Sequence, residues 1–307
     1  MNINDLKVDK FIDPFDSNFY NIRVSTNIGN TFAISGFGSD ENEEVALAKA
    51  ISEYYERLVF KRISSRISST SNGYACHPDF HMCRKKALCE IIERDSVLTG
   101  WINFTAPYWL TVEDLANLQL SNLAVHDQLL RRFDFEVKYA INSVTSGVYT
   151  IIASLKSLVG DFGFVITSSA SSDIRQAVLS NVLDVRRSAN LIHNRRVNKQ
   201  PIFKNLVAEN VACPADHLEF YLNPKNAKGT EWFFDGAPDA PIYSFIRFEI
   251  EELEIGVATP WKLNVLRAMS SELQDYFVGR TTKEKINKIR NPFLKGPNFN
   301  QQLHPLA

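Results

Sequence analysis

Hydrophobic and polar positions show two patterns at the start of the chain, one typical of strands and one typical of a helix. The segments NFYNIRVST and NTFAISGFG mix aromatic and β-branched residues with polar ones and stop at glycine, a pattern that predicts two strands. From residue 42 to 63 the apolar positions recur at steps of three and four, which predicts a helix. Asp40 precedes this helix and is the expected N-cap.

Helical and strand-like patterns then alternate in groups. A second helix is predicted over residues 79–101 and a third over residues 173–194. Between them lie three strand candidates that suggest an antiparallel meander, FEVKYAINSV, GVYTIIASLK and FGFVITSS. This grouping favours an α+β fold with antiparallel sheet over a nucleotide-binding fold built from alternating parallel units.

The pattern is weaker in the last hundred residues. A strand pair is predicted near PIYSFIRFEI and LEIGVAT, and a helix around LNVLRAMSSELQDYF. The final segment, NPFLKGPNFNQQLHPLA, is rich in proline, glycine and asparagine and is expected to be irregular.

Composition narrows the class of protein. The chain has 307 residues, 45% hydrophobic and 22% charged, so a sizeable core is available. The formal net charge of −1 disfavours a nucleic-acid coat protein. No signal peptide and no apolar run long enough to cross a membrane is visible, and four cysteines do not form a disulfide scaffold. We therefore expect a cytoplasmic protein with no membrane and no nucleic-acid partner.

An internal repeat is the most informative feature. Residues 49–57 read KAISEYYER and residues 86–94 read KALCEIIER, with lysine, alanine, glutamate, glutamate and arginine in the same order. On a helix, Glu53 and Glu56 lie one turn apart on one face, and so do Glu90 and Glu93; their mutual repulsion would favour bound cations. A solvated helix face is the plain alternative.

Oxygen ligands favour Mg²⁺ or Ca²⁺ over zinc or copper. Because Mg²⁺ commonly binds together with substrate phosphates, the paired carboxylates predict a nucleotide site. Arg57 and Arg94 directly follow the two pairs and could contact phosphate oxygens. A carboxylate-bridged di-iron site is less favoured because no histidine follows either pair.

Two segments resemble the YcaO family. STSNGYACHPDFHMCRKKALCEIIERD is similar to the centre of that family, with its Ser-Asn-Gly and its Glu-x-x-Glu-Arg helix, and SGFGSDENEEVALAKAISEYYER is similar to its Gly-x-Gly segment and first such helix. The resemblance is strong over residues 35–100 and covers the remainder in outline. It implies one YcaO-like domain over 1–307, an α+β fold with antiparallel sheet and carboxylate-bearing helices around a nucleotide site. Its expected parts are the N-terminal strands and first two helices (1–110), a third helix and C-terminal sheet (130–280), and an irregular tail (290–307).

The resemblance also implies a reaction. Members of the family use ATP and Mg²⁺ to phosphorylate a peptide backbone amide oxygen, which activates the amide for attack and yields azolines, thioamides or amidines in ribosomally made peptides. It implies that the four repeat glutamates are metal ligands and that Ser71, Asn72 and Arg94 lie near the nucleotide. A precursor peptide and a separate leader-binding or enzyme partner protein are the expected partners. Azoline formation by a cyclodehydratase-like enzyme is the first expectation.

The chain departs from the family pattern in three places. Lys49 replaces a serine in the first helix and could contact a phosphate. In the third helix Ser180, Asp184 and Arg187 replace a basic residue, a glutamate and a glutamine; Asp184 could still bind Mg²⁺, whereas Arg187 could pair with Asp184 or with phosphate. The tail keeps His304-Pro305 without the closing repeated prolines, and His304 is a candidate base.

These departures keep alternatives open. One is a thioamide- or amidine-forming enzyme, and another is a YcaO-fold protein with a degenerate nucleotide site that acts as a scaffold or allosteric partner. A zinc site is a further, less favoured alternative, since its candidate ligands lack Cys-x-x-Cys spacing and Cys89 suits a buried helix position; these candidates are Cys76, His77, His81, Cys83 and Cys89.

Overall fold

The structure is a computed structural model of a chain that forms two compact units. The first comprises Met1–Ile91 and Phe248–Ser270, and the second comprises Ile92–Arg247 and Ser271–Ala307. The described residues are 6–28, 32–67, 70–120, 123–235, 242–244, 246–253, 262–287, 290 and 299–306.

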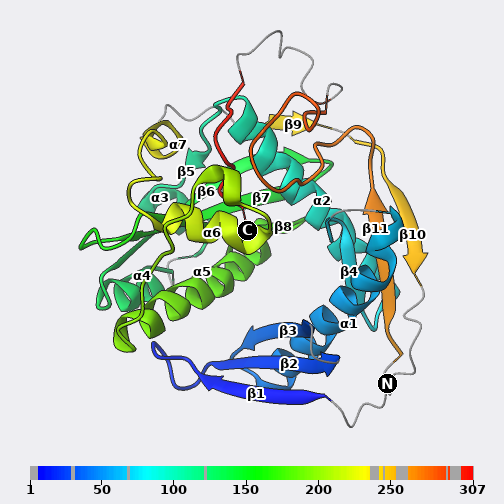
Figure 1. The fold of residues 1–307 in the computed structure, drawn as a ribbon, viewed down its shortest axis with the longest axis horizontal. Coiled ribbons are helices and arrows are strands. Elements are labelled where there is room, and N and C mark those ends of the chain that lie inside the picture. The colour runs from blue at the N-terminus through cyan, green and yellow to red at the C-terminus, as the bar shows by residue number, and fades with distance from the viewer. Residues whose placement is uncertain are drawn as a thin grey trace. The chain divides into compact units, whose positions relative to one another are not determined.

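A three-stranded antiparallel sheet and one long helix form the N-terminal part of the first unit. The sheet has the order β1-β2-β3, and α1 packs against β3 and β2 (Figure 1). The alternating apolar residues of the strands face this helix, so that Ile22, Val24 and Ile34 share a core with Tyr54 and Leu58. The bounds are β1 (Lys7–Ile12), β2 (Tyr20–Ile28), β3 (Phe32–Asp40) and α1 (Glu43–Ile67).

The Gly-x-Gly segment of β3 is where α1 comes closest to the sheet. A Cβ atom on Gly38 would lie 1.9 Å from the Ala46 carbonyl oxygen, and one on Gly36 would lie 2.1 Å from the Ala50 carbonyl oxygen. Both obstacles are main-chain atoms of α1, which cannot swing aside. Glycine is therefore required at both positions by strand–helix packing.

Asn42, and not Asp40, caps α1. The Asn42 side-chain oxygen accepts hydrogen bonds from the main-chain N–H groups of Glu44 (2.9 Å) and Val45 (3.2 Å). Asp40 lies two residues too early for this role: it accepts from the Asn42 N–H and pairs with Lys49. The prediction of Asp40 as the cap is wrong because the helix begins two residues later than a cap at Asp40 would require.

A second antiparallel sheet in this unit has the order β10-β11-β4. The helix predicted around residues 263–277 is wrong, since β11 pairs on one side with β4 and on the other with β10, and these two ladders fix its backbone as a strand. The second strand of the predicted C-terminal pair, LEIGVAT, lies outside the described residues from residue 254 onward. The bounds are β4 (Tyr74–His77), β10 (Glu249–Leu253) and β11 (Asn264–Met269).

Helix α2 (Phe80–Ile102) carries the second Glu-x-x-Glu-Arg copy, and the boundary between the units falls within it. Asp79 caps this helix by accepting the Met82 N–H at 2.7 Å. In the described part of the chain, no helix combines the length and the apolar character needed to span a bilayer.

The second unit is built on the predicted meander. β6, β7 and β8 pair antiparallel, β5 pairs with β6, and β9 adds to β6 in parallel. Helix α5 lies against β7 and β8 (Figure 1), and Asp173 caps it. The strands are β5 (Tyr108–Trp109), β6 (Phe135–Thr145), β7 (Val148–Ser157), β8 (Phe164–Ser171) and β9 (Ile242–Ser244), and the helices, of which only α5 was predicted, are α3 (Val112–Asn117), α4 (Leu123–Arg131), α5 (Ile174–Val197), α6 (Pro214–Leu222) and α7 (Glu231–Asp235).

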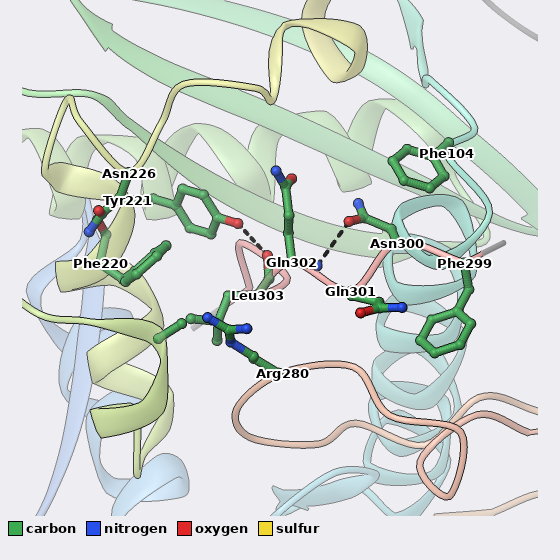
Figure 2. A pocket seen from close by; sticks show the side chains of 11 residues that line it. Phe104, Phe220, Tyr221, Asn226, Arg280, Phe299, Asn300, Gln301, Gln302 and Leu303 are labelled. Carbon is green, nitrogen blue, oxygen red and sulfur yellow. Dashed lines mark hydrogen bonds between the residues drawn. The ribbon is translucent and has the colours of Figure 1, made fainter. Parts of the chain in front are cut away.

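The C-terminal segment 299–306 lies buried within the second unit. It has neither helix nor strand apart from one isolated bridge between Leu303 and Arg280. The segment is irregular, as predicted, but it is buried: Leu303 and Leu306 are each 1% exposed. Beside it opens a cavity of about 440 Å³, which Figure 2 shows.

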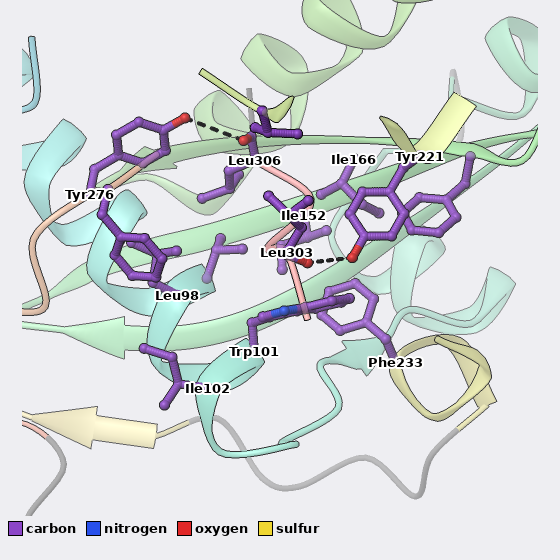
Figure 3. Packing of buried hydrophobic residues seen from close by; sticks show 14 of the residues in the cluster. Leu98, Trp101, Ile102, Ile152, Ile166, Tyr221, Phe233, Tyr276, Leu303 and Leu306 are labelled. Atoms are coloured by element: carbon purple, nitrogen blue, oxygen red, sulfur yellow. Dashed lines mark hydrogen bonds between the residues drawn. The ribbon is translucent and has the colours of Figure 1, made fainter. Parts of the chain in front are cut away.

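Aromatic rings and the C-terminal leucines form the core of this unit. Figure 3 shows Trp101 of α2 among the rings of Tyr221 and Phe233, with Leu303 and Leu306 packed in the same cluster. The hydroxyl of Tyr221 donates to the Leu303 carbonyl, and that of Tyr276 donates to the Leu306 carbonyl. The tail is therefore a structural part of the second unit.

Candidate functional site

Glu56 lies at the centre of a group of acidic side chains in the first unit. Burial raises the pKa of Glu56 well above its ordinary value, and the nearby carboxylates of Glu90 and Glu53 raise it further. Arg57 and Lys86 act in the opposite direction, and their effects are smaller. This excess of negative charge is the setting in which a cation would be bound favourably.

Glu53 forms a hydrogen bond and an ion pair within the first unit. It accepts the main-chain N–H of Phe37, between the two glycines of β3, at 2.5 Å, and pairs with Arg57 at 2.5 Å. Arg57 also donates to the Ser35 carbonyl oxygen at 2.8 Å. These contacts orient the helix face that carries Glu56.

The two lysines of the repeat have different surroundings. Lys49 donates to the Asp40 carboxylate (2.7 Å) and to the Ser39 carbonyl oxygen (3.1 Å). Lys86 lies near Glu56, whose charge raises the pKa of Lys86, but burial has the larger effect and lowers it. Sequence analysis singled out Lys49 and missed Lys86, although Lys86 occupies the same place in the second copy of the repeat.

The Ser71-Asn72-Gly73 turn is held in place by β11. Gly73 has φ +80°, and a Cβ there would lie 2.3 Å from the Ala268 carbonyl oxygen, so this position requires glycine. The Ala268 N–H donates to the Gly73 carbonyl oxygen at 2.8 Å. The side-chain oxygen of Asn72 is buried without a hydrogen-bond partner within the described residues, so a bound ligand could satisfy it.

The cysteines near this turn are neutral thiols. Burial raises the pKa of Cys76 to about 12 and that of Cys83 to about 11, and Glu56 raises both further. Cys83 donates to the carbonyl oxygens of Ala75 and Asn264, and Cys89 is buried in α2. Among the described residues, no three histidine, cysteine, aspartate or glutamate side chains are grouped so as to hold a metal ion by themselves.

The second unit carries Glu93 and Arg94. Burial raises the pKa of Glu93, and the charge of Asp184 raises it further, while Arg94 and the Ser168 hydroxyl lower it. Ser168 donates to Glu93 at 2.7 Å, and Arg94 lies 3.6 Å from the same carboxylate and over the ring of Tyr276. Glu93 is thus a largely buried carboxylate with one neutral and one cationic partner.

Asp184 and Arg187 of α5 form an ion pair. Their closest atoms are 2.8 Å apart, with the Asp184 side chain 33% exposed and that of Arg187 50% exposed. Ser180, one turn earlier on α5, is exposed. Of the two partners predicted for Arg187, the structure shows Asp184.

His304 is fully buried among aromatic side chains. Its Nε2–H donates to the Phe277 carbonyl oxygen at 2.6 Å, and its ring stacks on His217 with 4.1 Å between centroids. His217 accepts the Gly279 N–H at Nε2 and donates from Nδ1 to the His304 carbonyl oxygen. Burial lowers the pKa of His304 well below its ordinary value. These contacts give His304 a role in anchoring the tail, and its role as a base stays a prediction.

Asp95, directly after the repeat, is a buried residue that sequence analysis did not single out. It is 0% exposed, accepts the Gln274 N–H at 2.8 Å and pairs with Arg290 at 2.9 Å. Burial raises the pKa of Asp95, against the lowering effect of Arg290. This pair ties residues 274–290 to α2 within the second unit, and only its position next to Arg94 could have drawn attention to it.

The residues of the first unit fit a Mg²⁺ ion that is also bound by phosphate. Mg²⁺ usually keeps waters and uses one or two protein carboxylates together with substrate phosphates. Glu56 and Glu90 supply two neighbouring carboxylates with excess negative charge, and Glu53 pairs with Arg57. A cage of protein ligands alone is not needed for such a site.

A comparison with known protein families gives the decisive match. The sequence model of a family described as YcaO cyclodehydratases that bind ATP and Mg²⁺ matches residues 59–254, more than half of the chain. The chain belongs to the YcaO family. ATP and Mg²⁺, predicted from the sequence, are confirmed as the cofactors in the description of this family. A search of curated proteins found no match.

Solved structures confirm the α+β YcaO fold. A heterocyclase in complex with substrate and cofactor matches with a TM-score of 0.66 at 11% identity over 98% of this chain, which spans about half (54%) of that heterocyclase. The YcaO protein of Methanopyrus kandleri bound with AMPPCP and Mg²⁺ matches with a TM-score of 0.61 at 14% identity, covering 91% of this chain and 90% of that one. The E. coli microcin synthetase McbBCD complex with pro-MccB17 bound matches with a TM-score of 0.63 at 10% identity, covering 98% and 96%. These identities show the fold alone.

Proposed function

We propose that this YcaO protein uses ATP and Mg²⁺ to activate a backbone amide of a ribosomally made precursor peptide. In the first product we expect, a cysteine, serine or threonine side chain adds to the amide carbon, the amide oxygen departs as phosphate, and an azoline ring remains. When bound, ATP would supply the phosphoryl group and Mg²⁺ would neutralise the charge of the phosphates.

The single observation that carries this proposal is the charge environment of Glu56. Burial and two adjacent carboxylates disfavour its ionised form, and the structure retains all three acids on helices that contain the family motif. Such an arrangement costs stability in the empty protein. A bound cation would remove that cost.

Individual side chains would have separate tasks. Glu56 and Glu90 would hold Mg²⁺, and Glu53, fixed by Arg57 and the Phe37 N–H, would position α1. The Asn72 side-chain oxygen, which has no partner among the described residues, would accept a hydrogen bond from the nucleotide. Metal or nucleotide contacts by Lys49, Ser71, Glu93, Arg94 and Asp184 stay predictions.

Partners and location complete the proposal. We infer a precursor peptide and a separate protein that binds its leader or completes the enzyme; this is supported by the likeness in fold to the E. coli microcin synthetase McbBCD complex with pro-MccB17 bound. We propose that the protein acts in the cytoplasm. Thioamide or amidine formation is the alternative outcome of the same amide activation.

The test follows the amide oxygen. A candidate precursor peptide would be synthesised with ¹⁸O in its backbone carbonyls and incubated with the chain, its partner, ATP and Mg²⁺. Amide activation predicts ¹⁸O in the released phosphate and a loss of one water per azoline. Phosphate that carries oxygen from solvent alone would show ordinary ATP hydrolysis and contradict the proposal.

A second candidate function rests on the Asp184–Arg187 pair. The Arg187 guanidinium neutralises the Asp184 carboxylate, which would take the place of the family's glutamate on α5. A chain with a site weakened in this way would act as a scaffold or allosteric partner of another modifying enzyme. Stimulation of that enzyme by a chain that itself binds no ATP would favour this function.

A further inference from the structure

The cavity beside the C-terminal segment lies entirely within the second unit. Its volume of about 440 Å³ is in the range of small-ligand sites. None of the residues assigned above to metal or nucleotide lines it. It is therefore a separate candidate for binding.

Aromatic rings and primary amides line this cavity. Figure 2 shows the rings of Phe220 and Tyr221 on one side and those of Phe104 and Phe299 on the other, with amide side chains between them. An aromatic wall takes apolar groups. Primary amides donate and accept hydrogen bonds in the same way as a peptide group does. The amide-bearing side chains are Asn226, Asn300, Gln301 and Gln302.

The hydrogen bonds of Asn300 indicate which kind of ligand group the cavity would bind. The residue is 1% exposed, its main-chain N–H donates to the Ile102 carbonyl oxygen, and its side-chain oxygen accepts the Gln302 N–H at 3.0 Å. The last bond fixes which side-chain atom is oxygen, because an N–H can only donate. The remaining side-chain nitrogen is a buried donor without a partner in the part of the chain that the structure describes. A ligand carbonyl is the group that would satisfy it.

The charge of the cavity disfavours an anion. Among the described residues that line it, Arg280 is the single charged one. Its guanidinium is paired at 2.6 Å with Glu209. A phosphate or carboxylate would have to compete with this partner, whereas a neutral ligand would not.

We propose that this cavity binds the precursor peptide through one apolar side chain and the adjoining backbone carbonyl, which accepts from the Asn300 side-chain nitrogen. The aromatic rings enclose the side chain, and the glutamine and asparagine amides at the opening pair with the neighbouring peptide groups. This proposal rests on the proposed function and adds to it a determinant of which peptides are accepted.

Calorimetric titration of the full chain with capped tripeptides tests this directly. The probes are N-acetyl-Gly-X-Gly-amide peptides in which X is leucine, phenylalanine, lysine or aspartate. We expect the leucine or phenylalanine peptide to bind at least about tenfold more tightly than the lysine and aspartate peptides, because a charged side chain would lose its water on entry and the charged lining residue, Arg280, is already paired with Glu209.

Matched variants assign the binding to the cavity. Ala208→Phe fills it, while Val207→Phe adds the same ring at the adjacent residue, which is 54% exposed and does not line the cavity. Asn300→Asp keeps the acceptor for the Gln302 N–H and removes the donor. Ala208→Phe and Asn300→Asp should each weaken binding about tenfold or more, and Val207→Phe by less than about twofold.

Three results would overturn the proposal: no measurable binding of any tripeptide, equal binding by wild type and Ala208→Phe, or competition with the apolar tripeptide by adenosine. Binding of ATP with Mg²⁺ is measured on the same preparations. A wild-type chain that binds ATP with Mg²⁺ but no tripeptide refutes the peptide cavity alone, whereas a chain that binds tripeptides but no nucleotide refutes the proposed function.

Discussion

Substitution of Gly38 by alanine separates two explanations of the Gly-x-Gly segment. A glycine-rich turn that approached a phosphate would affect nucleotide binding when substituted. In the structure Gly38 instead contacts α1: a Cβ there would lie 1.9 Å from the Ala46 carbonyl oxygen and 2.7 Å from the Ala50 nitrogen. We therefore predict that Gly38→Ala destabilises the first unit.

The size of the effect follows from the geometry. Relief of the contact needs a shift of more than about 1 Å between β3 and α1, since ordinary contacts lie near or above about 3.5 Å. Overpacking of this kind costs about 3 kcal/mol. For a unit of roughly one hundred residues, this lowers the melting temperature by about 12 °C.

Thermal unfolding followed by circular dichroism measures this change, with Gly160→Ala as the control. Gly160 has φ +75°, and nothing lies within 4 Å of a Cβ built there, so its alanine variant carries left-handed strain of about 1 kcal/mol without a clash. Gly38→Ala should lose at least about twice as much stability as the control. The packing explanation fails if Gly38→Ala melts like wild type but no longer binds ATP.

Three further predictions concern the second unit. Arg290→Met leaves the Asp95 carboxylate buried without its cation and should lower the free energy of unfolding, measured in urea, by about 3 kcal/mol. A second substitution, Asp95→Asn, should restore part of this loss. A loss under about 1 kcal/mol in Arg290→Met would contradict the prediction. Burial lowers the pKa values of His304 and His217, so the unfolded chain takes up protons below pH about 6.5 before the folded chain does. The free energy of unfolding should therefore fall as pH drops through that value, and less steeply in His304→Gln. Identical profiles of the urea midpoint against pH in the two proteins would contradict this prediction. Arg187→Gln should tighten calorimetric Mg²⁺ binding in the presence of an ATP analogue by up to about fivefold by freeing the Asp184 carboxylate, whereas an unchanged affinity would contradict a metal contact by Asp184.

Local patterns were enough to predict the elements that carry the motifs. The steps of three and four around Tyr54 and Leu58 located α1, and β-branched alternation located β6, β7 and β8. The repeat aligned Glu53 with Glu90 and Glu56 with Glu93, and the structure brings the charges of Glu53 and Glu90 near Glu56. These features depend on residues close in sequence, where periodicity is informative.

Long-range contacts decided what the sequence did not predict. The apolar run that begins at Asn264 suits a helix or a strand, and only pairing with β4 and β10 makes it a strand. His304 was expected in an irregular tail, but the packing of Leu303 and Leu306 against distant aromatic residues buries it. Asn42 caps α1 in place of Asp40 because Asp40 is the last residue of β3 and the helix begins only at Glu43.

Calorimetric binding of ATP with Mg²⁺ tests the central claim most directly. The wild-type chain is compared with the double variant Glu56→Gln, Glu90→Gln and with Glu44→Gln, which neutralises an exposed glutamate on α1. The account predicts binding to wild type and to Glu44→Gln and its loss, by at least about a hundredfold, in the double variant. Equal binding by the double variant would show that these carboxylates do not hold the metal, and no binding by wild type, alone or with its partner, would contradict an ATP-dependent function.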